Sequence, residues 1–170
     1  MRKLIAIALC LFGFIGNADS AELPIGPMLF KLGAPQASVM TEVGERFRVI
    51  SVTGNPDMFF LAERDAPNNN VIGGISFSKG RLNWVQRNWG SFDGSARADD
   101  VAKALHSAIE SATAATGSSA IVSTKINRVP GTEFRSTYFQ FPGRKVSFTV
   151  ADGDSTNGGK QVTVDESISP

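Results

Sequence analysis

The hydrophobic pattern of residues 35–52 changes from a helical period to a strand period. Apolar residues recur three and four positions apart within 35–44, between Pro35 and Gly44. Proline is favoured at the first helical position, and glycine is a common helix stop. In 46–52, apolar side chains occupy both faces of a β-propensity-rich run. We therefore expect a helix over 35–44 followed by a strand over 46–52.

Several other apolar segments have the length and composition of strands and are separated by turn residues. Pro and Gly between two such segments suit the centre of a tight turn, as at Pro142 and Gly143. The pattern predicts further strands at 58–63, 71–78, 81–88, 120–127, 133–141, 144–151 and 161–165.

The longest predicted helix lies between these two groups of strands. Its apolar stripe consists of Val101, Leu105, Ala108, Ile109 and Ala112. Asp99 and Asp100 suit the positive end of the helix dipole, and Gly117 supplies a stop. The stripe predicts that Leu105 and Ile109 are buried and that His106, on the opposite side, is exposed.

The order of elements is helix, strands, helix, strands, with short connections throughout. Short connections cannot hold many crossover helices, so the sheet should be mostly antiparallel. The sequence therefore predicts an α+β fold in two layers, with the helices on one face of the sheet. Residues 21–170 have the length of one domain, which divides into possible α-β-β-type halves at 21–90 and 91–170.

Residues 1–20 have the order of a cleavable signal peptide. Arg2 and Lys3 precede the apolar run 4–16, and small residues follow it, with Ala18 and Ser20 at the positions expected for cleavage before Ala21. The run is shorter than the roughly 20 residues that span a bilayer. We therefore expect export to the periplasm or the medium, with no stable membrane anchor after cleavage.

The composition argues against several kinds of function. Without Arg2, Lys3 and Asp19, the 17 basic and 16 acidic residues fall to 15 each, so the net charge is near zero. Binding a phosphate backbone needs a concentrated basic patch, and we therefore expect no nucleic-acid partner. The single Cys, Cys10, precedes residue 21. One histidine and no cysteine in residues 21–170 exclude a zinc site built from several N and S ligands. We predict neither a metal nor a cofactor.

Catalytic features are sparse. Glu110 is placed to orient His106, but such a pair on one helix is commonly a surface contact. The loop 152–159 is rich in Asp, Asn and Gly, yet its Gly spacing departs from an EF-hand and Thr163 occupies the position of the bidentate Glu. We predict no catalytic residue, and a hydrolase that uses unidentified carboxylates stays open as an alternative.

The segment 81–89 carries both tryptophans of the chain, among arginines. Simple alternation places Trp84 on the face of Leu82 and Trp89 on the opposite face. If Leu82 faces the core, Trp89 then points outward; alternatively, Trp89 covers the rim of the core. Tryptophan and arginine are enriched in binding hot spots. The candidate binding residues are Arg81, Trp84, Arg87 and Trp89.

The first half also contains glycines and apolar residues in an arrangement that is found in a known family. They are Leu32-Gly33-Ala34-Pro35, Val39, Val43-Gly44, Gly74-Ile75-Ser76-Phe77 and Gly80-Arg81-Leu82. The arrangement resembles the helix-hairpin module of SmpA-type outer-membrane assembly lipoproteins and of β-lactamase inhibitor proteins. This resemblance implies protein binding without catalysis. The lipid-attachment and disulfide cysteines of those families have no counterpart here, so the resemblance implies no anchor.

Together these patterns predict an exported, non-enzymatic binding domain of the bacterial envelope that recognises another protein. Two alternatives from other functional classes remain. One is the small hydrolase, which requires convergent carboxylates in a cleft. The other is a carrier of an apolar ligand, which requires a cavity between sheet and helix.

Overall fold

The computed structural model describes residues 21–66, 70–153 and 159–170, which form two helices and ten strands. The first half contains β1 (Glu22–Ile25), β2 (Met28–Lys31), α1 (Gln36–Arg46), β3 (Phe47–Val52), β4 (Asn55–Glu63), β5 (Val71–Ser78) and β6 (Arg81–Asp93). The second half contains α2 (Ala98–Thr116), β7 (Ile121–Val129), β8 (Thr132–Phe141), β9 (Arg144–Gly153) and β10 (Lys160–Ile168). The predicted signal peptide lies outside the described residues.

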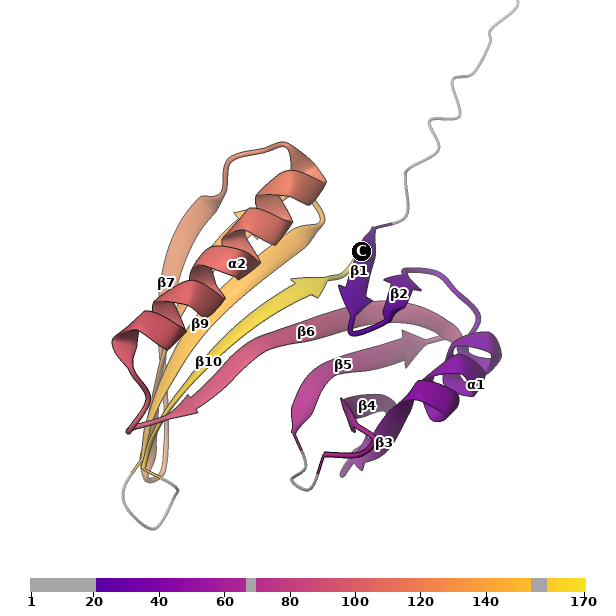
Figure 1. Cartoon of the computed structure of the whole chain (residues 1–170), viewed down its shortest axis with the longest axis horizontal. Coiled ribbons are helices and arrows are strands. Elements are labelled where there is room, and N and C mark those ends of the chain that lie inside the picture. The colour runs from indigo at the N-terminus through magenta and orange to yellow at the C-terminus, as the bar shows by residue number, and fades with distance from the viewer. Residues whose placement is uncertain (1–20, 67–69, 154–158) are drawn as a thin grey trace, which may run out of the picture.

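Eight of the described strands form one sheet in the order β3-β4-β5-β6-β10-β9-β8-β7, and every neighbouring pair is antiparallel. Each half contributes four strands, and the last strand of each half, β6 or β10, lies at the centre (Figure 1). This sheet confirms the predicted mostly antiparallel, sheet-rich fold. The two halves are therefore joined by backbone hydrogen bonds between β6 and β10.

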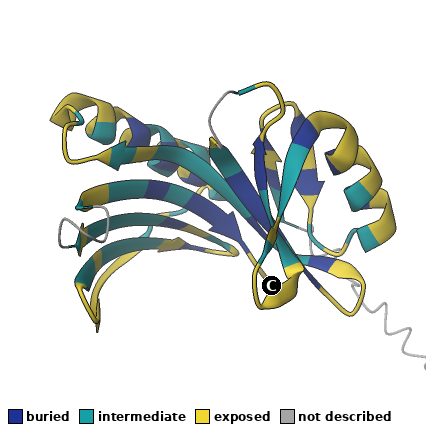
Figure 2. Cartoon of the chain, turned by 90° about the horizontal axis from the view of Figure 1, so that it is seen from below, coloured by how far each residue is buried: buried dark blue, intermediate teal, exposed yellow. Residues whose placement is uncertain are grey.

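The first hydrophobic core lies between α1, the β1-β2 hairpin and strands β3 to β6 (Figure 2). Val39 and Val43 of α1 are buried in it, which confirms the helical stripe. Leu23 and Ile25 of β1 are fully buried in the same core. The sequence pattern did not predict this hairpin, because its two strands are short and contain or flank prolines. Their conformation depends on packing against the main sheet.

The second core lies between α2 and strands β6, β8, β9 and β10. Its most buried helical positions are alanines, at 104, 108 and 112, whereas Leu105 and Ile109 pack beside them and are only partly buried. The buried stripe therefore runs through these alanines, and the predicted burial of Leu105 and Ile109 is only partial. Small side chains let the helix lie close to the sheet. Gly117 ends α2 as predicted, with a left-handed φ of 61° that favours glycine.

Several element boundaries differ from the prediction. The helix α1 continues past Gly44, and β4 begins at Asn55 within the predicted turn. The strand β6 runs to Asp93, beyond the predicted end at residue 88, because this extension pairs with β10. Long-range pairing, which local patterns do not encode, sets the boundaries of the two strands.

Candidate functional site

The direction in which Trp84 points is set by a bulge in β6. Leu82 pairs with Phe77, but Trp84 pairs with Ser76, so Asn83 is an extra residue in β6. Leu82 and Phe77 are both buried in the first core. The extra residue shifts the alternation, and Trp84 therefore lies on the face opposite Leu82. The prediction that Trp84 shares the core face with Leu82 is wrong for this reason.

The Trp84 indole packs over Gly74 of β5. A Cβ atom at Gly74 would lie 3.1 Å from Cζ3 of Trp84, closer than ordinary van der Waals contact. Glycine therefore leaves the space that the indole ring occupies at this position. Trp84 is only partly buried and lies outside both hydrophobic cores.

Three other apolar side chains lie on the same face of the sheet as Trp84. Ile50 pairs with Phe60, Phe60 pairs with Gly74, and Met58 pairs with Ser76, the partner of Trp84. These side chains are also partly exposed and outside both cores. We call this set the Trp84 patch; its members are Ile50, Met58, Phe60 and Trp84. Its members come from β3, β4 and β6, and Gly74 of β5 lies between Phe60 and the Trp84 indole.

Polar side chains continue this face into the second half. Gln86 donates a hydrogen bond of 2.8 Å to Asp165, which pairs with Asn88 across β6 and β10. Burial raises the pKa of Asp165, although hydrogen bonds from Gln86 and Thr163 act in the opposite direction. Farther along, Ser136 and Thr149 are 2.9 Å apart. This face of the sheet therefore joins an apolar patch to a surface of hydrogen-bonding groups.

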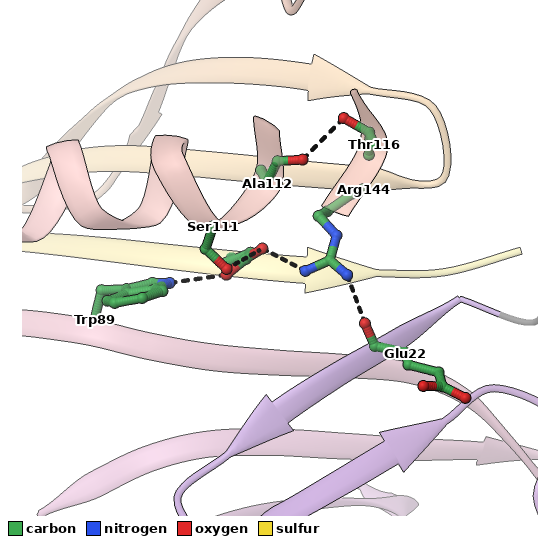
Figure 3. Close-up of polar contacts among 7 residues, drawn as sticks. Glu22, Trp89, Ser111, Ala112, Thr116 and Arg144 are labelled. Carbon is green, nitrogen blue, oxygen red and sulfur yellow. Dashed lines mark hydrogen bonds and ion pairs between the residues drawn. The ribbon is translucent and has the colours of Figure 1, made fainter. Parts of the chain in front are cut away.

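Trp89 lies on the other face and takes part in a buried polar cluster (Figure 3). Its Nε1 donates a hydrogen bond of 3.0 Å to Oε2 of Glu166, whose side chain is fully buried. Ser111 of α2 donates to Oε1 of the same carboxylate over 3.3 Å. Trp89 also packs against the second core. The prediction that Trp89 points outward is therefore wrong, since its face of β6 is the core face.

Arg144 completes this cluster and links it to the N-terminal hairpin. Its Nη1 donates to Oε1 of Glu166 over 2.5 Å, and its Nη2 donates to the backbone oxygen of Glu22 over 2.5 Å (Figure 3). The Arg144 side chain is 9% exposed. A buried carboxylate with three donors is well satisfied. The cluster thus connects α2, β1, β6, β9 and β10, and sequence reasoning missed it because its members are far apart in the chain.

The two remaining candidate arginines have internal contacts. The guanidinium of Arg87 stacks on the Trp89 ring, 3.6 Å from its centroid. Burial lowers the pKa of Arg87, and the charge of Glu166 opposes this change. Arg81 is exposed but donates a 2.9 Å hydrogen bond to the backbone oxygen of Gly33. The structure therefore brings Arg87 and Trp89 together and separates both from Trp84 by the thickness of the sheet.

The other candidate chemistry is dispersed. His106 is exposed, as predicted, and lies 3.1 Å from Glu110 on the same helix. Among the described residues, no group of three or more His, Cys, Asp or Glu side chains is placed to hold a metal ion. The centre of the candidate calcium loop, residues 154–158, lies outside the described residues.

Two cavities flank α2. The larger, of about 660 Å³, lies where the end of α2 and the β8-β9 turn meet the N-terminal hairpin, and Glu22, Lys31 and Arg144 line it. The other, of about 420 Å³, is lined by Leu105, Phe148 and further apolar residues near the start of α2. None of the described helices is long and apolar enough to cross a bilayer.

Comparisons with known proteins indicate no function for these residues. No protein-family model, curated protein or solved structure matches the chain.

Proposed function

We propose that the protein is an exported, non-enzymatic binding domain of the bacterial envelope that recognises another protein through the Trp84 patch. One observation carries this proposal: aromatic and aliphatic side chains gather on a sheet face outside both cores. Large aromatic side chains dominate the energetics of protein interfaces. The neighbouring polar groups, including Gln86 and Asn88, suit the hydrogen-bonding rim of such an interface.

The four residues proposed from the sequence divide into two roles in this scheme. Trp84 contacts the partner directly. Arg87 and Trp89 lie on the opposite face and support the sheet from the core side. Arg81 holds the loop at Gly33 beside the start of β6. The proposal thus keeps Trp84 as the anchor and gives the other three positioning roles.

The resemblance to SmpA-type and inhibitor modules supports protein binding as the activity. The two-layer arrangement belongs to the same proposal. Val164 packs against the core beneath α2, Glu166 accepts from Ser111 of α2, and Ile168 packs in the core beneath the hairpin. Alternation along β10 gives these three side chains one face. Both helices and the hairpin therefore cover the same face in this scheme, and the opposite face is left for the partner.

The test compares two tryptophan substitutions on one sheet strand. Tagged residues 21–170 with Trp84→Ala should lose capture of the partner from the native envelope while the thermal midpoint stays close to wild type. Trp89→Ala is the matched control: it should lower the free energy of unfolding by about 3–5 kcal/mol and reduce capture only in proportion to folded protein. Trp84→Phe should restore part of the binding.

Titration of the purified partner against each variant then gives the dissociation constants. Equal affinity of wild type and Trp84→Ala would refute the patch as the recognition site. Capture lost only in Trp89→Ala, at full stability, would assign recognition to the opposite face.

A carrier of an apolar ligand is the second candidate. The cavity beside Leu105 and Phe148 supports it, because apolar pockets of this size accept small molecules. A fluorescent apolar probe that binds the wild type but not Leu105→Trp, a variant in which the Trp84 patch is intact, would favour this function. The hydrolase alternative gains no support from Glu166, since Arg144, Trp89 and Ser111 occupy its carboxylate.

A further inference from the structure

The strand β7 forms one end of the sheet and is exposed along its whole length. All nine residues of Ile121–Val129 are exposed, and among the described strands only β8 pairs with β7. Among the described residues, five large hydrophobic side chains are strongly exposed, and four of them belong to this strand: Ile121, Val122, Ile126 and Val129. A long edge strand with exposed apolar side chains is a template for pairing with another chain.

The other end of the sheet does not share this character. The edge strand β3 has no strongly exposed large hydrophobic residue, and its alternation is interrupted by a bulge between Ser51 and Val52. Phe47 of β3 is buried in the first core. Bulges and short length protect edges from pairing. The contrast identifies β7 as the edge that is suited to pairing.

We propose that β7 pairs antiparallel with β7 of a second copy of this chain, in a register centred on Thr124. Thr124 then lies opposite Thr124 of the second copy. Val122 lies opposite Ile126, and this apolar pair occurs twice because of the two-fold symmetry. Pairs of β-branched side chains directly opposite each other stabilise antiparallel strands.

This register also places the pairs of Val122 and Ile126 beside the second core. Val122 pairs with Phe139 of β8, which packs against the second core. Val122 and Ile126 share a face of β7, since they are four residues apart. Two copies therefore extend the second core across the interface, and the eight-stranded sheets join edge to edge.

The charges and the proline disfavour the registers centred on the next two residues of the strand. Centring the pair on Lys125 places two lysines directly opposite each other, which is destabilising. Centring it on Ile126 brings Pro130, which has no amide hydrogen, into the paired segment. In the proposed register, Lys125 faces Ser123, and the pairing spans 120–128 without Pro130. Arg128 is already paired with Glu133.

Cysteine cross-linking tests the register, because residues 21–170 contain no cysteine. Directly opposed Cα atoms are roughly 4.5–5.5 Å apart, within the range that a disulfide spans. Thr124→Cys should therefore form a covalent dimer on mild oxidation, seen on a non-reducing gel. Lys125→Cys and Ile126→Cys should not, since their counterparts are offset along the strand. Cross-linking of either in place of Thr124→Cys would overturn the proposed register.

Sedimentation velocity of residues 21–170 tests the association itself. The wild type should sediment as a dimer, and Ile126→Lys should sediment as a monomer with an unchanged circular dichroism spectrum. Leu29→Lys is the matched control, because Leu29 is the fifth strongly exposed large hydrophobic residue and lies on β2. This variant should stay dimeric. A wild type that is monomeric at all concentrations, or a dimer lost only in Leu29→Lys, would overturn the proposal.

Discussion

Glu166 is the residue whose environment departs most from its chemical type. A fully buried carboxylate is costly unless it is paired and hydrogen-bonded, and here Arg144, Trp89 and Ser111 all donate to it. Removing one partner of such a pair leaves the other charge uncompensated. The stability of the junction between helix, hairpin and sheet therefore depends on this one side chain.

Glu166→Gln should lower the free energy of unfolding by about 3–5 kcal/mol, because it leaves the Arg144 guanidinium buried without its counter-charge. Urea denaturation followed by tryptophan fluorescence measures the change. Glu110→Gln is the control, since its partner His106 is exposed, and it should change stability by less than about 0.5 kcal/mol. A small effect of Glu166→Gln would show that the cluster is not a stabilising junction.

Asp165, the residue before Glu166, faces the other side of the sheet. Its environment predicts that stability depends on pH. Burial raises its pKa in the folded protein, so the folded state binds the proton more tightly than the unfolded state. Its contribution to stability is present at low pH and is lost as the pH rises through the folded pKa. Asp165→Asn should therefore gain stability relative to wild type between about pH 3 and pH 7.

The matched control is Asp93→Asn. Hydrogen bonds from Ser95 lower the pKa of Asp93, so its contribution is present above the unfolded pKa and is lost as the pH falls. Relative to wild type, this variant should lose stability as the pH rises from about 2 to about 5, around and below the unfolded pKa of about 3.9. Urea titrations at several pH values measure both differences. Parallel pH profiles for wild type and Asp165→Asn would contradict the assignment.

At the scale of elements, α2 depends on small side chains. Ala108 and Ala112 are fully buried, so the helix lies close to the sheet with little space between them. Ala108→Leu should destabilise the protein by about 1–3 kcal/mol, because the added carbons must displace the helix or the strands beneath it. Thermal unfolding measures this cost. Ala114→Leu, on the exposed side, should have little effect; equal midpoints for the two variants would mean that α2 is loosely packed.

At the scale of the whole molecule, the expected cleavage site adjoins the folded region. Cleavage before Ala21 leaves a chain that starts one residue before β1, whose Leu23 and Ile25 belong to the first core. The protein purified after export should therefore have an intact mass that lacks residues 1–20. Variants in which Ala18 and Ser20 are replaced by bulky residues should retain the segment. A wild-type protein that keeps its first 16 residues would contradict export by cleavage.

The sequence by itself predicted the elements whose periodicity is local. Val39 and Val43 mark α1, Gly117 marks the end of α2, and short apolar segments separated by turn residues mark the eight strands of the large sheet. These signals are readable because helix and strand periods depend on neighbouring residues only. The antiparallel arrangement followed from the same information, since short connections leave few other topologies.

The tertiary structure alone decided which face of β6 each tryptophan occupies. Trp84 and Trp89 exchanged faces because the extra residue at Asn83 shifts the alternation of β6, and that bulge depends on pairing with β5. The β1-β2 hairpin depends on the core that it covers. Glu166 is tolerated inside because Arg144 of β9 reaches it. Each outcome rests on contacts between residues distant in sequence, which no local pattern contains.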